Sequence, residues 1–318
     1  MKKVSIIGSG NVGANSAFFI AENCSASVTL VDIREGVSKG KALDLSEAGP
    51  IRGYNTIIRG ADSIEEISGS DIVVIAAGRV RGPQETRDDL YRDNASLMRE
   101  ICRSIKSLAP ESVVINIVEP VDRIVLLIRE LLGFDRSRIL GVGGLLSSTR
   151  LRFLVSSALG VSAREVTGMV VGPHNHNMVI LRNTIRVSGI PADKLLPPER
   201  FESIIEQVRT AGDTILQLSE RSTAFYAPSA AVASLVQAVA LDTRAILPVS
   251  YPLKGEYGLD NIAVSIPACI RAGGVDRSVP VEMDASEKEA FDSAVAELRA
   301  SMEKTAGPAE GTGGKPNA

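Results

Sequence analysis

Short runs of apolar, β-branched residues alternate with longer helical patterns through the first half of the chain. The runs SIIG, VTLVD, DIVVIAA and SVVINIV are apolar almost throughout, which is typical of parallel strands covered on both faces. The predicted strands are Val4–Ile7, Val28–Asp32, Thr56–Ile58, Asp71–Ala76, Ser112–Ile117 and Arg138–Gly141. The predicted helices between them are Asn11–Glu22, Ser38–Glu47, Asp89–Leu108 and Val121–Leu132. This alternation predicts an α/β fold with a doubly wound parallel (Rossmann) sheet over residues 1–144.

After residue 144, strands and helices no longer alternate one by one, which predicts a separate α+β domain over residues 145–304. Its predicted helices are Leu145–Leu159, Glu199–Leu218, Ala227–Leu241 and Ser286–Glu303. Strand-like runs are Thr167–Val171, a hairpin-like stretch Met178–Val187, Ile246–Tyr251 and Ala263–Pro267. Residues 305–318 are rich in Gly and Pro and are predicted to form a disordered tail.

The composition narrows the class of protein. With 318 residues, 44% of them hydrophobic, the chain can bury a large core. Its formal net charge of −3 argues against nucleic acid or an anionic membrane as a partner. The sequence contains neither an apolar run of the roughly 18 residues that a membrane helix needs nor a secretory leader pattern. Cys24, Cys102 and Cys269 form no CxxC pair, so a reduced, cytoplasmic protein is expected.

A glycine-rich turn follows the first predicted strand directly and opens a helix. It reads Gly8-Ser9-Gly10-Asn11-Val12-Gly13. In such a turn Gly8 permits the tight bend, Gly10 lets a pyrophosphate approach the backbone, and Gly13 lets the helix pack on the sheet. The helix N-terminus supplies free N–H groups for the phosphates. The strand before and the helix after the turn indicate a dinucleotide site.

Asp32 lies at the end of the second predicted strand, 19 residues beyond Gly13. A carboxylate in that place bonds the hydroxyls of the adenosine ribose and repels a 2′-phosphate. The cofactor is therefore predicted to be NAD in preference to NADP. Arg34, two residues further on, is the one neighbour that weakens this preference.

A loop with three arginines follows the strand that ends at Ala76. Arg79, Arg81 and Arg87 stand among Gly, Pro and polar residues, beyond the carboxyl end of a strand, where α/β sheets bind ligands. Guanidinium groups pair with carboxylates in bidentate fashion, and such loops can close over a substrate. The residues alone also fit a solvated basic turn, so both interpretations stay open at this point.

This loop resembles the active-site loop of malate dehydrogenases of the lactate dehydrogenase-like type. Further segments match that family in order and spacing over about residues 1–303. They are GSGNVG, GKALDLSEAGPI (Gly40–Ile51), VEPVD (Val118–Asp122), LLSSTRLR (Leu145–Arg152), GPHNH (Gly172–His176), FYAPSAA (Phe225–Ala231) and GEYGLDNI (Gly255–Ile262).

The resemblance implies an NAD-dependent oxidoreductase that moves a hydride between the nicotinamide and C2 of a small 2-hydroxy or 2-oxo acid. It assigns acid–base chemistry to His174. Carboxylate binding falls to Arg150 and Arg81, and polarisation of the carbonyl to Arg87. The nicotinamide side is expected to be lined by Asn94, Ile117, Val118 and Glu119. Ala77 and Gly78 are also expected to bind the cofactor. The resemblance also implies an enzyme of the tricarboxylic acid cycle that forms a homodimer or homotetramer.

The chain departs from the family pattern around the expected substrate. Ser147 stands where the family has the aspartate that orients its histidine, and Glu119 stands where it has an asparagine. Gly172-Pro173-His174-Asn175-His176 replaces GxHGD, and Gln84, Glu85 and Ser222 are further changes. An ionised Glu119 could be the counter-charge for His174, neutralise Arg87 or meet a cationic group of an unusual substrate. A protonated Glu119 could donate a hydrogen bond to the substrate oxygen.

Three functions therefore compete. The leading one is a malate dehydrogenase, because Arg81, Arg87 and Arg150 are all present. The second is a dehydrogenase of a different 2-hydroxy acid, and the third is a catalytically impaired NAD-binding paralogue, suggested by Ser147 beside His174. His176 has no matching role in the family, and no metal site is predicted.

Overall fold

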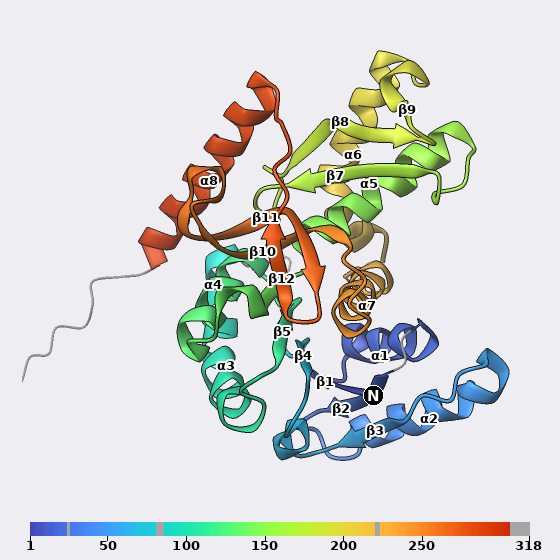
Figure 1. Ribbon diagram of the computed structural model, residues 1–318, viewed down its shortest axis with the longest axis vertical. Helices are drawn as coiled ribbons and strands as arrows, with labels where there is room; N and C mark the ends of the chain where they lie inside the picture. Colours follow the sequence, from blue (N-terminus) through green and yellow to red (C-terminus); the bar gives the residue numbers. More distant parts are fainter. Residues whose placement is uncertain (24–25, 81–85, 220–222, 306–318) are drawn as a thin grey trace, which may run out of the picture.

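A nine-stranded mixed sheet forms the centre of the protein (Figure 1). The computed structural model describes residues 1–23, 26–80, 86–219 and 223–305. The strand order is β12-β11-β10-β6-β5-β4-β1-β2-β3. The parallel strands are β1 (Lys2–Ile7), β2 (Ala26–Val31), β3 (Ile58–Ala61), β4 (Ile72–Ile75), β5 (Val113–Asn116) and β6 (Ile139–Gly141). This part is the predicted Rossmann sheet.

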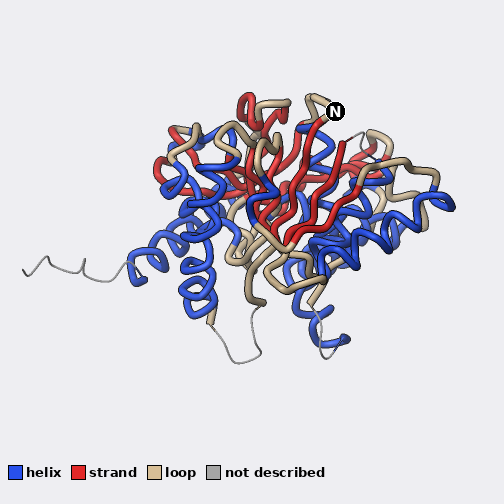
Figure 2. Tube along the Cα trace, turned by 90° about the horizontal axis from the view of Figure 1, so that it is seen from below, coloured by secondary structure: helices blue, strands red, loops and turns tan. Residues whose placement is uncertain are grey.

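Helices cover both faces of this sheet, and alternate strand residues supply two cores (Figure 2). Ile72 and Val74 of β4 face one core, whereas Val73 and Ile75 face the other. The period of two explains why these strands are apolar throughout. The first core packs against α1 (Asn11–Asn23) and α7 (Tyr226–Ala240), and the second against α3 (Arg87–Leu108) and α4 (Val121–Leu132).

Two predicted elements of the first half needed correction. The third strand is not Thr56–Ile58 but Ile58–Ala61, because these are the residues in register with β2, from Val28 opposite Ile58 to Val31 opposite Ala61. The helix predicted at Ser38–Glu47 is longer and forms α2 (Val37–Arg52), which ends where Gly53 adopts a φ of 79°.

Three antiparallel strands from the second half extend the same sheet. They are β10 (Ile246–Lys254), β11 (Asp260–Arg271) and β12 (Gly274–Ser278), and the last of these was not predicted. Strand β10 joins the parallel part where Ser250 lies opposite Gly141 of β6. The two halves of the chain therefore share a sheet. The boundary predicted between residues 144 and 145 stays a prediction.

A smaller antiparallel sheet lies beside the helices of the second half. It consists of β7 (Val166–Val171), β8 (Val179–Val187) and β9 (Ile190–Pro191). The hairpin predicted within Met178–Val187 is wrong, since this stretch is a single strand that pairs with β7. The polar residues that interrupt its apolar pattern, Arg182 and Asn183, have exposed side chains.

The remaining helices are α5 (Gly143–Leu159), α6 (Pro198–Ser219) and α8 (Ala285–Thr305), with short 3-10 helices at Ile64–Ile67, Arg136–Arg138, Ala192–Lys194 and Glu256–Gly258. Within the described ranges, no helix is both long and apolar enough to cross a membrane. Most of the predicted tail, residues 306–318, lies outside the described residues.

Because Gly144 is closely packed where the two halves meet, we expect one added methyl group there to lower the stability of the protein. A Cβ on Gly144 in α5 would lie 2.7 Å from the Val170 carbonyl oxygen and 2.7 Å from Ser265 Cβ. Gly144→Ala is therefore expected to lower the free energy of unfolding in urea by about 1–3 kcal/mol. Gly40→Ala in α2 is the matched control, because a Cβ there meets nothing within 4 Å. It should stabilise by about 0.5–1 kcal/mol, and equal effects of the two changes would contradict the packing argument.

Candidate active site

The glycine-rich turn after β1 has the geometry that dinucleotide binding requires. Gly8 has a φ of 101°, and a Cβ on it would lie 2.5 Å from the Ala77 nitrogen. A Cβ on Gly13 would lie 1.9 Å from the Gly8 oxygen, so only glycine lets α1 pack this closely. A Cβ on Gly10 meets nothing within 4 Å, which leaves space for a ligand beside the backbone. The turn fits a pyrophosphate.

Asp32 follows β2 and points at the same turn. Its Oδ2 accepts a 2.9 Å hydrogen bond from the Ser9 backbone N–H, and Arg34 binds both carboxylate oxygens through its side chain. Bonds from the Arg34 side chain hold the pKa of Asp32 at about 2, against the effect of burial. Asp32 is therefore a fixed anion at the edge of the predicted cofactor site.

A pocket of about 260 Å³ opens beyond the carboxyl ends of β4 and β5. The loops after these strands form one wall, and helices from the second half form the other. Its lining includes these predicted site residues: Val12, Gly78, Arg87, Ile117, Val118, Glu119, Arg150 and His174. These residues come from segments far apart in the sequence and line one cavity, and Val12 connects that cavity to the glycine-rich turn.

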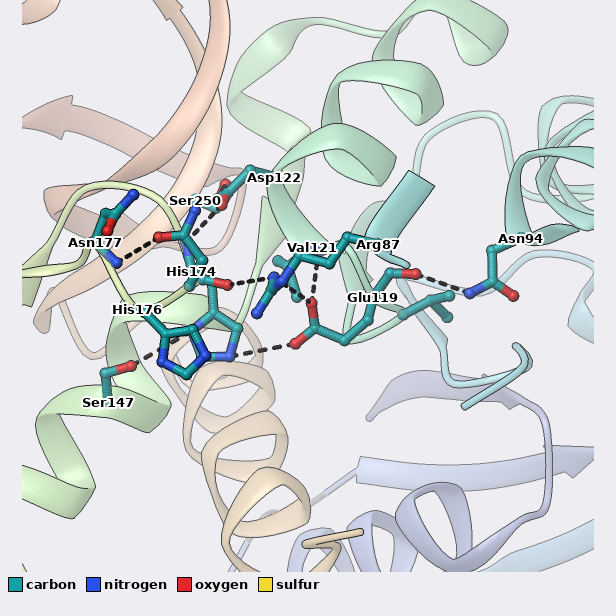
Figure 3. Close-up of polar contacts among 12 residues, drawn as sticks. Arg87, Asn94, Glu119, Val121, Asp122, Ser147, His174, His176, Asn177 and Ser250 are labelled. Carbon is teal, nitrogen blue, oxygen red and sulfur yellow. Dashed lines mark hydrogen bonds and ion pairs between the residues drawn. The ribbon is translucent and has the colours of Figure 1, made fainter. Parts of the chain in front are cut away.

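His174 is held through its backbone as well as its ring (Figure 3). Gly172, with a φ of 85°, turns the chain after β7 and pairs with Ser265 of β11 through two backbone hydrogen bonds. The His174 N–H donates to Asp122 Oδ2 at 2.7 Å, and the Ser250 hydroxyl donates to Asp122 Oδ1 at 2.6 Å. Segments from both halves of the chain therefore fix the position of this residue.

The two ring nitrogens of His174 face different partners. Its Nδ1 lies 3.4 Å from Ser147 Oγ, and its Nε2 lies 3.3 Å from Glu119 Oε1 (Figure 3). Burial lowers the pKa of His174, Glu119 opposes this effect, and the charges of Arg150 and Arg87 add to it. A histidine that is neutral near pH 7, beside one carboxylate, can accept a proton.

Arg87 reaches this histidine from the first turn of α3. A capping box between Thr86 and Asp89 sets the start of the helix: the Asp89 N–H donates to Thr86 Oγ1, and the Thr86 N–H donates to the Asp89 side chain. The Arg87 guanidinium then donates to the His174 carbonyl oxygen at 3.1 Å and lies 4.0 Å from Glu119 Oε2.

Arg150 lies on α5, three residues after Ser147, so both side chains share one face of the helix. Burial lowers the pKa of Arg150, and its Nε has no hydrogen-bond partner among the described residues. A half-buried guanidinium of this kind at a pocket wall is suited to bind an anion, because a polar group shielded from water without a partner is costly.

Asn94 and Ala77 are not among the residues that line this pocket, and their cofactor-binding role stays a prediction. Asn94 is 1% exposed and ties two loops together behind the wall: it accepts from the Arg79 N–H at 2.8 Å and donates to the Glu119 carbonyl at 2.8 Å. Ala77 packs its backbone against Gly8. Arg81, Gln84, Glu85 and Ser222 lie outside the described residues.

Sequence reasoning missed three residues of this site. Asp122 is a buried carboxyl two positions after the Pro120 turn, and nothing in its local pattern points to His174, which lies 52 residues later. Asp213 and Arg209 reach the pocket from α6, where they resemble any polar residues of an amphipathic helix. Asp213 Oδ2 lies 3.1 Å from Nε2 of His176, so this second histidine also belongs to the pocket wall.

Metal ligation finds no support in the described ranges, where no group of three or more His, Cys, Asp or Glu residues is placed to hold an ion. The arrangement instead combines an imidazole, a carboxylate and two guanidinium groups next to a dinucleotide-type turn. Such a set suits proton transfer to or from a small anionic substrate.

Comparison with known proteins gives a consistent result. The profile described as "lactate/malate dehydrogenase, NAD binding domain" matches residues 2–141, and "lactate/malate dehydrogenase, alpha/beta C-terminal domain" matches residues 145–307. The chain is 42% identical to malate dehydrogenase of Thermomicrobium roseum over 290 residues, covering 91% of this chain and 94% of the relative. It is 40% identical to that of Staphylococcus carnosus over 294 residues, covering 92% and 94%.

Solved structures agree with this result. Malate dehydrogenase of Cryptosporidium parvum superposes with a TM-score of 0.93 at 31% identity, covering 96% of this chain and 99% of that one. Lactate dehydrogenase of the same organism, solved with lactic acid and nicotinamide adenine dinucleotide, gives a TM-score of 0.92 at 28% identity, covering 96% and 98%.

The buried Asp122 predicts a pH-dependent stability. Burial raises its pKa from 3.8 to about 7, although bonds from Ser250 and His174 lower it. Between these pH values the folded protein retains a proton that the unfolded chain loses, so stability falls as pH rises. Asp122→Asn keeps an acceptor for the His174 N–H but cannot ionise.

We therefore expect the wild type to lose stability relative to Asp122→Asn from about pH 4 to pH 7, by up to about 1.4 kcal/mol per pH unit. Above pH 7 the difference should level off. Urea denaturation across this range measures it, and a difference that does not change with pH would contradict a protonated, buried Asp122.

Proposed function

Because the chain belongs to the lactate/malate dehydrogenase family, we propose that this NAD-dependent enzyme oxidises malate to oxaloacetate and catalyses the reverse reaction. The observation that carries the proposal is Arg150: its half-buried side chain, whose shielded Nε has no hydrogen-bond partner among the described residues, lines the same pocket as the acid–base candidate His174. A substrate carboxylate bound there would place its C2 oxygen near the imidazole. Arg81, on the loop after β4, is proposed to hold the second carboxylate.

His174 is proposed to act as the base in malate oxidation. With its proton on Nδ1, the ring donates to Ser147 Oγ, and the Nε2 lone pair, on the side of the ring where Glu119 lies 3.3 Å away, accepts the proton of the substrate hydroxyl. The O–H bond breaks, its proton moves to Nε2, and the C2–O bond becomes a carbonyl. Bound NAD supplies the acceptor for the hydride that leaves C2. In the reverse direction the protonated His174 returns its proton to the oxygen, and Arg87 polarises the carbonyl.

Glu119 is proposed to be the counter-charge of the imidazolium. The family's aspartate would face Nδ1, but Ser147 carries no charge, whereas Glu119 approaches Nε2 to 3.3 Å. It lies 4.0 Å from Arg87, so the histidine is the nearer of the two groups. Of the alternatives considered for this residue, the contacts favour an ionised Glu119 that stabilises His174 after the proton has moved.

A second candidate substrate is a related 2-hydroxy acid with less negative charge than malate. Glu119 and Asp213 place two carboxylates at the pocket, and these reduce the attraction for a dianion. The direct comparison follows NADH consumption with oxaloacetate, pyruvate and 2-oxoglutarate.

We expect the highest kcat/KM with oxaloacetate, because three arginines remain for two carboxylates. His174→Asn should lower kcat by about 10²–10⁴ while NADH binding, followed by its fluorescence, stays unchanged. Faster turnover of pyruvate or 2-oxoglutarate would mean that the corresponding 2-hydroxy acid is the substrate and malate is not. Tight NADH binding with no turnover of any acid would instead support the impaired paralogue.

Glu119→Gln tests the counter-charge through the pH profile. Glu119 raises the pKa of His174, so removing its charge should lower that pKa further. Oxaloacetate reduction needs the protonated ring and is lost as pH rises through this pKa. The alkaline decline of kcat/KM for oxaloacetate should therefore move to lower pH in the variant. Malate oxidation needs the neutral ring, so its acid limb should move in the same direction.

Glu130→Gln, on the exposed face of α4, is the control for this experiment and should leave both limbs in place. Profiles of Glu119→Gln that coincide with the wild type would contradict the role of Glu119.

Self-association and a cytoplasmic location are further parts of the proposal. The family's members usually form dimers or tetramers, and α2 presents the apolar side chains of Leu43 and Ile51, which are 62% and 90% exposed. Cys102 and Cys269 are free thiols, as a reduced compartment would require. A place in the tricarboxylic acid cycle follows if malate is the substrate.

A further inference from the structure

Arg34, on the loop after β2, binds the carboxylate of Asp32, which is the group proposed to hold the adenosine ribose. Asp32 Oδ1 accepts from the Arg34 N–H at 3.1 Å and from its Nε at 3.0 Å. Asp32 Oδ2 accepts from the Ser9 N–H at 2.9 Å and from Arg34 Nη2 at 3.1 Å. A carboxylate offers about four lone-pair positions, so all acceptor positions of Asp32 are in use.

Because its acceptor positions are in use, Asp32 has none left for a ribose hydroxyl. A 2′-hydroxyl or 3′-hydroxyl can bond Asp32 only by displacing one of the four donors, and the two side-chain donors of Arg34 are the mobile ones. Binding of NAD therefore competes with the ion pair between Asp32 and Arg34. The Arg34 side chain is 63% exposed, so it can swing away from the carboxylate toward solvent or toward a ligand.

The charge at this place also differs from that of a lone aspartate. Arg34 offsets the negative charge of Asp32 that would otherwise repel a 2′-phosphate. A second cation, Lys41, donates to the Ser9 carbonyl at 2.6 Å, beside the N–H that binds Asp32. In the described part of the chain, no carboxylate lies within ion-pair distance of Lys41. A phosphate here would meet two cations and one already neutralised anion.

We propose that Arg34 makes the cofactor site accept dinucleotides with a phosphate on the 2′-oxygen of the adenosine ribose, so that NADPH binds as well as NADH. The inference rests on the proposed function only in assigning Asp32 to the adenosine ribose. Arg34 acts in opposite directions on the two ligands: it competes with the hydroxyls of NADH for Asp32, and it forms charge-assisted bonds with the 2′-phosphate of NADPH.

Direct binding tests this without any dependence on turnover. The chain has no tryptophan, so the fluorescence of bound NADH and NADPH is read without protein interference from that residue. Titrations compare the wild type with Arg34→Ala and with the control Arg52→Ala. Arg52 is also an exposed arginine that pairs with a carboxylate, Glu22, at 2.6 Å. Adenosine 2′,5′-bisphosphate and ADP, used as competitors, isolate the contribution of the 2′-phosphate.

In the wild type we expect Kd values for NADPH and NADH within about tenfold of each other. Arg34→Ala should shift their ratio at least tenfold toward NADH, as expected for losing a charge-assisted bond, and Arg52→Ala should not shift it. A ratio that changes less than tenfold in Arg34→Ala, while NADH still binds, overturns this inference and leaves the proposed function intact. Failure of both dinucleotides to bind would overturn the cofactor site itself.

Discussion

The hydrogen bond from the His174 backbone to the buried carboxyl of Asp122 connects the proposed acid–base residue to helix α4. Asp122 stands at the start of α4, behind the parallel sheet, and also accepts a bond from Ser250 of β10. Strand β10 extends that sheet into the second half of the chain. One carboxyl group therefore joins both halves at the point where the histidine must be held.

Around His174, the charged side chains stand at different positions from those in the family pattern. The position that faces Nδ1 is a neutral serine, and the carboxylate has moved to Glu119 on the Nε2 side. A counter-charge on that side stands close to the substrate oxygen as well as to the imidazole. In the proposed mechanism, catalysis and substrate charge are coupled, because the carboxylate proposed to stabilise the imidazolium would also repel an anionic substrate. Arg87 and Arg150 offset that repulsion.

Much of the fold could be predicted from the sequence because buried parallel strands leave an unmistakable apolar pattern. The turn from Gly8 to Gly13 could also be predicted from a short segment, since a side chain at Gly8 or Gly13 would clash with neighbouring backbone. The apolar pattern did not predict the bounds of a strand where pairing with a neighbouring strand sets them. The third strand begins at Ile58 because β2 sets its register, and Met178–Val187 is one strand although polar residues interrupt it.

The site itself was predictable only in part. The resemblance assigns roles to His174, Arg150 and Ser147. His174 and Arg150 line one pocket, and Ser147 Oγ lies 3.4 Å from His174 Nδ1. The orientation of Glu119 between His174 and Arg87 depends on the loop after β5 and the first turn of α3, which no local pattern fixes. The structural part played by Asn94 could not be predicted either, because its amide bonds the backbones of two loops that are far apart in the sequence.

The most direct test of the account measures the pKa of His174 by NMR. The chain has two histidines, so labelled imidazole groups give two signals, and His176→Asn assigns them. The account predicts that His174 titrates below the ordinary value of 6.5 in the wild type and lower still in Glu119→Gln, because that variant loses the charge that favours the imidazolium. A His174 pKa that is the same in the two proteins would contradict the claim that Glu119 is its counter-charge.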